Sequence, residues 1–234
     1  GIQWLEFPRN GVKRGLKNRE GWDQSWYAYA ASRCIENHFQ PNTLSQPSFP
    51  KSWEVPPILL AKYAQYLPAM QAGGEKKAWR YWSSFALERH TNYHRLLSKP
   101  YESRKACSRL SPYLSWGNLS IRQVWNATRA LEECSPKANL NLRALQAFRN
   151  RLRWHDHFIQ KFEQDCLYES RAINRAFRRL PTSHSEDLLM AWAQGKTGYP
   201  LVDASMRALE ATGWVNFRMR AMLVSFLTHT LNLD

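Results

Sequence analysis

The sequence contains few cysteines, and no pair of them has metal-binding spacing. Cys34, Cys107, Cys134 and Cys166 lie far apart among 234 residues, and none belongs to a Cys-x-x-Cys motif. This spacing indicates neither a zinc site nor an iron–sulfur ligand set, and no metal is predicted. It favours free thiols in a reducing compartment, which we take to be the cytoplasm.

Long apolar runs are also missing. No stretch reaches the roughly 18 consecutive apolar residues of a transmembrane helix, and no signal peptide can be recognised, so we predict no membrane partner. The chain begins with Gly1 and stops at Asp234 within a pattern that still indicates a helix. We therefore expect a domain or fragment of a longer protein, folded as a monomer.

Acidic residues are scarce relative to basic ones. The chain has 33 Lys and Arg against 19 Asp and Glu, which gives a formal net charge of +14. Such an excess puts a positive potential over much of the surface and attracts phosphate-rich partners. No recognition-helix motif accompanies it. The charge thus predicts polyanion binding, with DNA contacted through its backbone.

Helical periodicity dominates the rest of the chain and predicts an all-α fold. The first twenty residues carry a basic stripe and are expected at the surface. We predict helices at residues 22–39 and 139–164 and from Glu75 onwards, with a proline-rich loop at 40–57. The Glu75 helix has one apolar face that includes Phe85 and Tyr93, with Arg89 facing out. The 139–164 helix has an apolar seam: Leu145, Phe148, Leu152, His155, Ile159 and Phe162.

The stretch GKTGYPLVDASMRALEATGWVNFRMRAMLVSFL, residues 195–227, organises the chain. A Gly-rich turn leads into two predicted helices, residues 203–211 and 214–231. Gly213 lies where a helix C-terminus favours a residue that tolerates the left-handed conformation. Arg218 and Arg220 interrupt an otherwise apolar second helix. That pattern is typical of a buried helix that serves a charged ligand, or of a core hairpin with two snorkelling arginines.

This stretch resembles, nearly residue for residue, a hairpin in the flavin-binding domain of the photolyase and cryptochrome family. The matching residues are Gly195, Thr197, Gly198, Tyr199, Pro200, Val202, Asp203, Ala204, Met206, Arg207, Leu209, Thr212, Gly213, Trp214, Arg218 and Arg220. The resemblance implies an all-α, multi-helix, truncated FAD-binding domain at residues 73–234, after an N-terminal helical and linker part at 1–72. The family's antenna domain and the carboxylates that pair with Arg220 are expected outside this chain.

The segment Ala106 to Ser120 resembles the loop with which the family cradles the FAD phosphates. Ser108, Arg109, Leu110 and Ser111 match, and Cys107 replaces a threonine. Hydroxyls and N–H groups before a short helix suit a pyrophosphate; without the family, both serines would be ordinary N-caps. Ser120 and Gln123 predict a capping box. The resemblance also places Tyr93 near the phosphate arm.

Residues 148–158 resemble a wall that the family shares between flavin and DNA. Phe148 stands where tryptophan is usual, Arg151 where repair enzymes carry a glutamate that meets the lesion, and His155 where arginine is usual. From the residues alone, His155 is equally a core histidine, and Arg151 fits a solvated helix face. Phe217 stands where the family has Asn beside flavin N5, and Asn216 is a candidate substitute.

The resemblance implies two sets of site residues. The FAD-binding set is Tyr93, Cys107, Ser108, Arg109, Leu110, Ser111, Phe148, Arg151, His155, Phe217 and Arg220, and the DNA-binding set is Arg151, Trp154 and Arg218. The implied function is a photolyase-like lyase that repairs pyrimidine photoproducts in DNA by light-driven electron transfer from FAD. Two alternatives stay open: a cryptochrome-like blue-light photoreceptor, which Arg151 and Phe217 favour, and a cofactor-free, basic nucleic-acid-binding helical domain.

Overall fold

The computed structural model describes residues 10–35, 56–63, 68–134, 140–179 and 182–233. The α-helices are α1 (Trp22–Ala31), α2 (Pro57–Tyr63), α3 (Glu75–Leu87), α4 (Tyr93–Leu96), α5 (Ser103–Ala106), α6 (Ser111–Ser115), α7 (Ile121–Cys134), α8 (Leu142–Gln164), α9 (Glu186–Ala193), α10 (Pro200–Thr212) and α11 (Phe217–Ser225). Shorter turns of helix are η3 (Arg89–Asn92), η5 (Cys166–Glu169), η6 (Arg175–Arg179) and the π-helical η7 (Phe226–Thr230). Within these ranges the one extended pairing is an isolated bridge between Ser183 and Leu233, and the predicted all-α class is confirmed.

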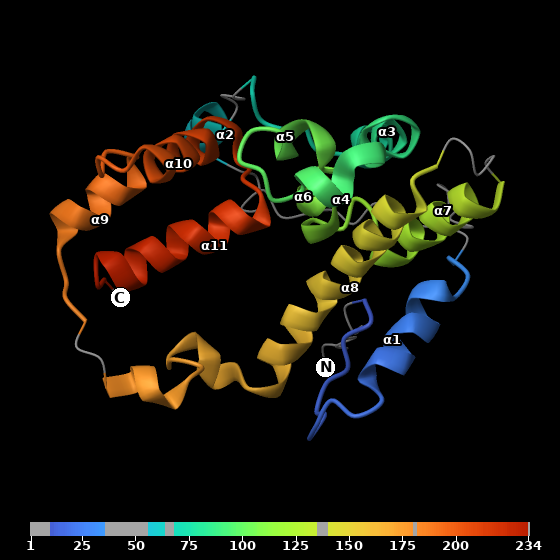
Figure 1. The fold of residues 1–234 in the computed structure, drawn as a ribbon, viewed down its shortest axis with the longest axis horizontal. Coiled ribbons are helices and arrows are strands. Elements are labelled where there is room, and N and C mark those ends of the chain that lie inside the picture. Colours follow the sequence, from blue (N-terminus) through green and yellow to red (C-terminus); the bar gives the residue numbers. More distant parts are fainter. Residues whose placement is uncertain (1–9, 36–55, 64–67, 135–139, 180–181, 234) are drawn as a thin grey trace.

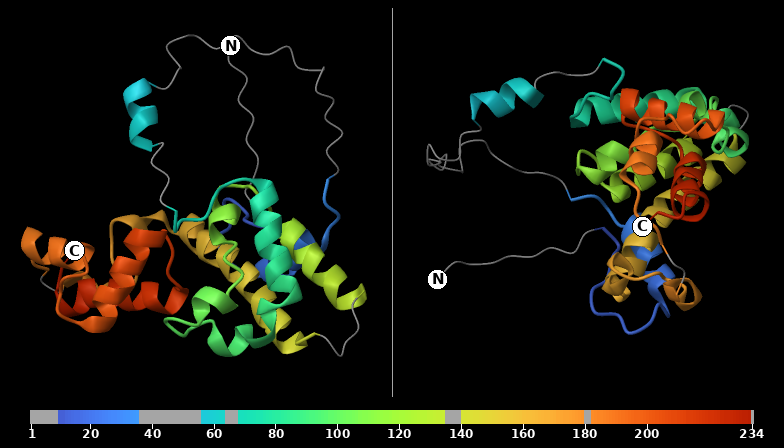
Figure 2. Two further views of the ribbon diagram at one scale, coloured as in Figure 1. Left: turned by 90° about the horizontal axis from the view of Figure 1, so that it is seen from above. Right: turned by 90° about the vertical axis from the view of Figure 1, so that its left-hand side faces the viewer.

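The long helix α8 runs through the middle of the molecule (Figure 1). Helix α1 packs against α7, and both α4 and α7 pack against α8. On the opposite side, α10 packs against α9 and α11, and this group stands apart from α7 in the left view of Figure 2. The described helices thus form two packed groups. None of them combines the length and apolar character that a bilayer crossing requires.

The larger group has an aromatic core. Trp26 is fully buried and meets Trp125 edge to face, with the ring centroids 5.3 Å apart. Phe85 meets Phe148 at 4.7 Å, which joins α3 to α8. Aromatic rings bury a large apolar area each. Because α1 contributes Trp22 and Trp26 to this core, it packs with the later helices; the division at residues 72 and 73 stays a prediction.

The smaller group has an aliphatic core from α10 and α11, which consists of Val202, Met206, Val215, Met219, Leu223 and Phe226. Only one face of α11 is buried, because Phe217, Arg218 and Val224 are exposed. The prediction of a helix buried almost all round is therefore wrong within the described residues.

Several helix ends differ from the sequence prediction. Helix α1 ends at Ala31 rather than at residue 39, because Ser32 is extended and its N–H and hydroxyl both donate to the Tyr29 carbonyl. Residues 36–55 lie outside the described ranges, and with them most of the predicted loop at 40–57. Pro57 begins α2 instead of ending the loop, as suits proline in a first helical turn.

The helix that starts at Glu75 is shorter than predicted. It ends at Leu87, where Glu88 leaves the helical region with φ −129° and ψ −55°. Tyr93 therefore begins the separate helix α4 rather than continuing the α3 face. Arg89 was predicted to face out, and this is wrong: its guanidinium donates to backbone carbonyls, including that of Tyr81 at 2.8 Å.

The buried seam of α8 also differs in its second half. Asn141 caps the helix by accepting from the Ala144 N–H, and the seam continues through Asp156 and Gln160, which are fully buried. Phe162, predicted to be in the seam, is exposed. The cause is the N-terminal segment, which docks on α8 through its backbone while Lys13, Arg14 and Lys17 stay exposed as predicted: the Lys13 N–H donates to Gln160 Oε1 at 2.6 Å.

The two helices of the 195–227 stretch begin at other residues than predicted. Proline occupies the first turn of α10, so this helix begins at Pro200 rather than at residue 203. Helix α11 begins at Phe217 rather than at residue 214, because Asn216 is extended and its side chain accepts from the Met219 N–H at 2.8 Å. Gly213 adopts φ 65° at the end of α10, as predicted for a C-terminal glycine.

Candidate functional site

A central cavity of about 380 Å³ lies between the two helix groups. Its walls come from α4, the loop before α6, α8 and the start of α11, and every residue of the predicted FAD-binding set lines it. Of the predicted DNA-binding set, Arg151 and Trp154 line it as well. Arg218 does not; it lies exposed on α11. The structure thus brings together residues that are up to 127 positions apart, from Tyr93 to Arg220.

The cradle loop, residues 107–111, forms one end of this cavity. Arg109 has φ 62°, and Leu110 after it lies in the right-handed helical region with φ −86° and ψ −11°. A left-handed residue followed by a right-handed one turns successive backbone N–H groups to one side and forms a concave site for an anion. Within the described ranges, the N–H groups of Ser108 and Arg109 have no hydrogen-bond acceptor.

The two serines of the loop are not helix caps. Leu110 occupies the N-cap position of α6 and makes no side-chain cap bond. Within the described part of the chain, the Ser108 and Ser111 hydroxyls make no hydrogen bond, so both are available to a ligand. By contrast, the predicted capping box of α7 is confirmed: Gln123 N–H donates to Ser120 Oγ at 3.1 Å, and Ser120 N–H donates to Gln123 Oε1 at 2.8 Å.

Arg109 is held by two neighbours. Its Nε donates to Gln71 Oε1 at 2.8 Å, and Gln71 Nε2 returns a bond to the Arg109 carbonyl at 2.9 Å. The guanidinium lies over the Trp214 ring, 4.5 Å from the centroid. Burial lowers the pKa of Arg109, and the cationic Arg104 lowers it further. A guanidinium nevertheless stays charged at neutral pH, so it keeps a cation beside the cradle loop.

The inner wall of the cavity is apolar and aromatic. Tyr93 and Phe148 are buried and meet edge to face at 6.0 Å. Burial raises the pKa of the Tyr93 hydroxyl far above its usual range, so the ring stays neutral. Burial also raises the pKa of the Cys107 thiol to about 11. The thiol is therefore protonated at neutral pH, and this wall presents no negative charge to a ligand.

The mouth of the cavity carries three aromatic rings, from Trp154, Phe158 and Phe217, which we call the aromatic triangle. Their centroids lie 6.2–6.3 Å apart in every pairing, and their exposed fractions are 39%, 48% and 50%. The Arg151 guanidinium lies 4.3 Å from the Trp154 centroid and 5.6 Å from that of Phe217. Arg151 thus faces the mouth rather than the solvated outer face of α8.

His155 lines the cavity but is only partly buried, so it is not the core histidine that the seam allowed. Its Nδ1 lies 2.9 Å from Asp156 Oδ1. Asp156 is fully buried and also accepts from Trp26 Nε1 at 2.8 Å and from the Gly11 N–H at 3.3 Å. This carboxylate joins the N-terminal segment to the helix that carries the cavity wall.

Asn216 is committed to the protein rather than to a ligand. Its amide Nδ2 donates to the Lys99 carbonyl at 3.0 Å and to Ser103 Oγ at 2.8 Å, while Oδ1 caps α11. Both amide protons are in use, so Asn216 does not offer the donor expected of a substitute for the asparagine beside flavin N5. Arg220 is exposed at the cavity edge.

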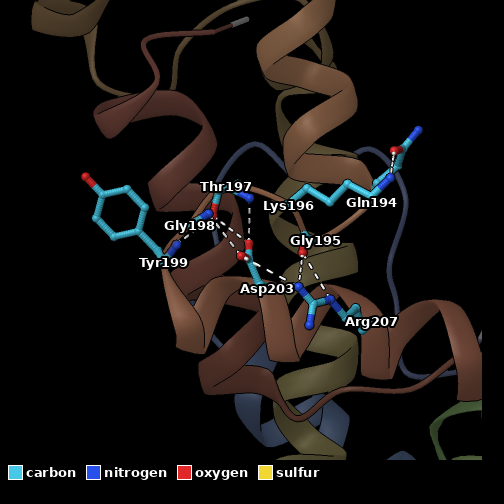
Figure 3. A network of polar contacts seen from close by, with 8 residues as sticks. All are labelled: Gln194, Gly195, Lys196, Thr197, Gly198, Tyr199, Asp203 and Arg207. Carbon is cyan, nitrogen blue, oxygen red and sulfur yellow. Dashed lines mark hydrogen bonds and ion pairs between the residues drawn. The ribbon is translucent and has the colours of Figure 1, made fainter.

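The turn between α9 and α10 is closed by a network of hydrogen bonds around Asp203 and Arg207 (Figure 3). Asp203 accepts from Thr197 N–H at 2.8 Å, Thr197 Oγ1 at 2.6 Å and Gly198 N–H at 3.0 Å. The hydrogen bond from the Thr197 hydroxyl is the main reason why the pKa of Asp203 lies below its usual range. Arg207 donates two hydrogen bonds to the Gly195 carbonyl. The turn thus has a structural role, away from the cavity.

Some cavity residues were not predicted from the sequence. Leu97, Leu114, Leu152, Phe158, Trp214 and Val215 also line it. Trp214 belongs to the matched hairpin, so the motif contained a signal for it. Phe158 ends the 148–158 stretch that resembles the wall, but its contact with Phe217 depends on how α8 and α11 pack. Within the described residues, no cluster of His, Cys, Asp or Glu is placed to hold a metal ion.

Comparison with known proteins places this geometry in a family. Residues 148–234 match the family model "FAD binding domain of DNA photolyase". A deoxyribodipyrimidine photo-lyase of Alkalihalophilus pseudofirmus is 34% identical over 163 residues, which are 69% of this chain and 32% of that protein. A bacterial class III photolyase from Agrobacterium tumefaciens aligns with a TM-score of 0.66 and 27% identity, over 74% of this chain and 34% of the other. A Synechocystis cryptochrome aligns with a TM-score of 0.61 and 26% identity, over 71% and 34%.

The fold is that of a helical FAD-binding domain. Residues 148–234 thus match an FAD-binding domain, and the chain is similar to both photolyases and cryptochromes. It spans about a third of the length of the relatives that it matches. Both photolyases and cryptochromes are among these relatives, so the family by itself leaves the activity open.

Proposed function

We propose that the chain is the flavin-binding part of a photolyase-like protein that uses light to repair pyrimidine photoproducts in DNA. The observation that supports this most is the central cavity, where all residues of the predicted FAD-binding set meet. FAD, when bound, supplies light absorption and electron transfer. The protein's own residues then bind and orient it and keep water away.

The residues of the cavity fit FAD in three respects. The cradle loop offers unbonded N–H groups at Ser108 and Arg109 and two free hydroxyls, which suit a diphosphate. Tyr93 and Phe148 offer an apolar wall for a planar ring system. The cavity volume of about 380 Å³ lies in the range of ligand sites, about 300–1,000 Å³.

DNA would meet the protein at the mouth of the cavity. The aromatic triangle offers exposed ring faces on which an unstacked base can lie, and Arg151 adds a cation beside them. Stacking of a base on an aromatic ring contributes about 1–3 kcal/mol. The net charge of +14 supplies attraction to phosphates that does not depend on sequence. Arg218, exposed on α11, is proposed as a backbone contact.

A cryptochrome-like photoreceptor without repair activity is the second candidate. The specific observation in its favour is the contact between Arg151 and Phe217. Arg151 replaces the carboxylate that the family resemblance leads one to expect, and a guanidinium cannot accept a hydrogen bond from a lesion. Phe217 replaces the polar residue expected beside the flavin. Two replaced residues thus touch each other at the mouth, where a repair enzyme would meet its substrate.

The first experiment measures flavin content. The protein is purified and its absorption spectrum recorded, with the Ser108→Ala/Ser111→Ala double variant beside it. We expect flavin bands in the wild-type protein and a lower occupancy in the variant, because two phosphate donors are removed. Ser115→Ala, on the same short helix but outside the cavity, is the control. Unchanged flavin content in the double variant contradicts the assignment of the cradle loop.

The second experiment separates the two candidates. Repair of cyclobutane dimers is assayed under blue light for wild type and Arg151→Glu, in the longest natural form of the protein. If repair is the function, we expect glutamate to raise dimer repair or lesion affinity. If Arg151→Glu repairs fewer dimers than wild type, the arginine itself takes part in repair. If neither protein repairs dimers, the photoreceptor function is favoured.

The third experiment tests the binding mode. Affinity for duplex DNA is measured at increasing salt. Several phosphate contacts predict a steep loss, roughly 10³-fold or more between about 50 and 200 mM salt for six or more contacts. An affinity that does not depend on salt would contradict binding through the backbone.

A further inference from the structure

Arg89 lies behind the cradle loop, on the side away from the central cavity. It opens the turn η3 directly after α3, and its side chain is partly buried. The guanidinium donates to four backbone carbonyls and one hydroxyl: Tyr81 O at 2.8 Å, Lys105 O at 3.3 Å, Ser108 O at 3.4 Å, Ser84 Oγ at 2.9 Å, and Cys107 O. Three of these carbonyls belong to the chain that leads into and forms the loop.

The partners of Arg89 are neutral. No ion pair of Arg89 with a carboxylate is found in the described part of the chain, and burial lowers the pKa of its guanidinium. An arginine stays protonated in such a site, so its hydrogen bonds to carbonyls are charge-assisted and stronger than neutral ones. A fixed fork of five donors suits several carbonyls at once, whereas a lysine ammonium does not.

These bonds determine where the loop's own donors point. In a planar trans peptide, the C=O of one residue and the N–H of the next point in opposite directions. Because the carbonyls of Cys107 and Ser108 point to Arg89, the N–H groups of Ser108 and Arg109 point away from it. Both residues line the cavity, and neither N–H has an acceptor within the described ranges.

The loop is held from a second side as well. Gln71 exchanges two hydrogen bonds with Arg109, through the Arg109 carbonyl and Nε. Arg109 has φ 62°, a conformation that a residue with a side chain adopts only when its surroundings impose it. Arg89 and Gln71 together supply those surroundings. Contacts within the protein therefore hold the loop in an anion-binding conformation.

We propose that Arg89 is a positioning residue for the phosphate end of the flavin site. It does not touch the ligand; it turns the N–H groups of the cradle loop toward the cavity and adds a positive charge behind them. The ligand group that it serves is a phosphate or diphosphate. The inference rests on the proposed binding of FAD at this loop.

The test compares a flavin that carries phosphates with one that does not. Dissociation constants of the 234-residue chain are measured for FAD and for riboflavin, which has the same ring system but no phosphate. The variants are Arg89→Met and Arg89→Lys. Arg80→Met is the matched control, since Arg80 lies exposed on α3 and has no hydrogen bond or ion pair within the described ranges.

For Arg89→Met we expect the affinity for FAD to fall roughly tenfold or more, by analogy with the loss of a residue that orients the ligands of a metal ion, and the affinity for riboflavin to stay about the same. Arg89→Lys keeps the charge but not the fork, so a smaller loss specific to FAD is expected. Arg80→Met should change neither constant. If Arg89→Met does not fold, the same two affinities, for FAD and for riboflavin, are compared between Arg89→Lys and wild type.

Equal losses for FAD and riboflavin would overturn the inference, because they would show that Arg89 only supports the fold. So would unchanged FAD affinity in both variants. The Ser108→Ala/Ser111→Ala variant keeps this failure apart from that of the proposed function. If the double variant loses FAD affinity while the Arg89 variants do not, only the inference fails. If neither loses it, or if the wild-type chain binds no FAD, the cradle assignment fails first.

Discussion

Asp156 and Asp203 are both buried aspartates, with exposed fractions of 0% and 7%, and each accepts hydrogen bonds from backbone N–H groups. They hold different parts of the molecule. Asp156 joins the N-terminal segment to α8, and thereby supports the wall of the central cavity that carries His155. Asp203 closes the turn that joins α9 to α10, in the smaller helix group.

The two differ in the separation of their partners along the chain. Asp203 accepts hydrogen bonds from residues that are five and six positions away. Asp156 accepts one from Trp26, which is 130 positions away. A contact of short separation closes a small loop at little entropic cost, and a contact across the chain forms only after much of the fold is ordered. Asp203 thus stabilises a local unit, and Asp156 depends on the packing of α1 and α8.

Replacing Asp156 by asparagine should have the largest effect. Trp26 Nε1 and the Gly11 N–H both donate to Oδ2, and Asn10 Nδ2 donates to Oδ1. Asparagine has one oxygen for these donors, so its NH2 group would oppose at least one of them and leave that donor unpaired. We expect a loss of about 3 kcal/mol in the free energy of unfolding, measured in urea. Asp187→Asn, an exposed position on α9, should change it by about 0.5 kcal/mol or less. If Asp156→Asn and Asp187→Asn lower the free energy of unfolding by similar small amounts, Asp156 does not hold the N-terminal segment to α8.

Replacing Gly195 by alanine should rank second and test the local unit. Gly195 has φ 63°, and an added Cβ would lie 2.7 Å from the Asp203 carbonyl oxygen. Strain and close contact together should cost about 2 kcal/mol in urea unfolding. Gly198 is the matched control. It has φ 84° in the same turn, but a Cβ added there would have no heavy atom within 4 Å. Its alanine variant should cost only about 1 kcal/mol, and an equal cost would refute the close contact.

The α7 capping box is a local interaction, like the Asp203 turn, but it lies in the larger helix group with Asp156. Ser120→Ala removes the acceptor for the Gln123 N–H. We expect a loss of about 1 kcal/mol in thermal or urea unfolding, as for other N-caps. The effect should add to that of Asp156→Asn in the double variant, since the two sites share no partner. Strong coupling would mean that α7 and the N-terminal docking form one unit.

A change of pH should have the smallest effect on the free energy of unfolding. The pH at which stability is lost should differ between the two helix groups. Burial lowers the pKa of His90, which lies in the larger group beside Phe85. As the pH falls below about 6.5, His90 binds its proton in the unfolded state before it does so in the folded state. The contribution of neutral, buried His90 to stability is therefore complete above about pH 6.5 and decreases below it. Asp203 also has a lowered pKa, so its contribution is lost only at more acid pH, below its ordinary value of 3.8.

This prediction is checked by urea midpoints from about pH 7.5 to about pH 5. His90→Gln keeps an acceptor for the Asn141 N–H and should flatten the decrease. His184→Gln, at an exposed position, should leave it as in wild type. A decrease of the same size in His90→Gln would assign the pH dependence to other groups.

The sequence predicted local structure well where the residues that interact are close together. The turn at residues 195–203, the C-terminal glycine of α10 and the α7 capping box follow from residue types at fixed short spacings. The cradle loop also came from a short motif, and the structure brings all its residues to the cavity. Helix ends were less accurate: Pro200 and Asn216 each set a boundary through local hydrogen bonding that the apolar periodicity did not reveal.

The contacts between distant segments depend on the tertiary structure. Asp156 and Gln160 are buried against the N-terminal segment, Arg89 binds the cradle loop, and Phe217 of α11 meets Trp154 and Phe158 of α8. Periodicity placed Arg89 on the solvent side of a continuous helix, whereas the end of α3 at Leu87 turned it toward the loop. A sequence pattern reports the face of one helix, and which partner that face meets depends on how every other helix packs.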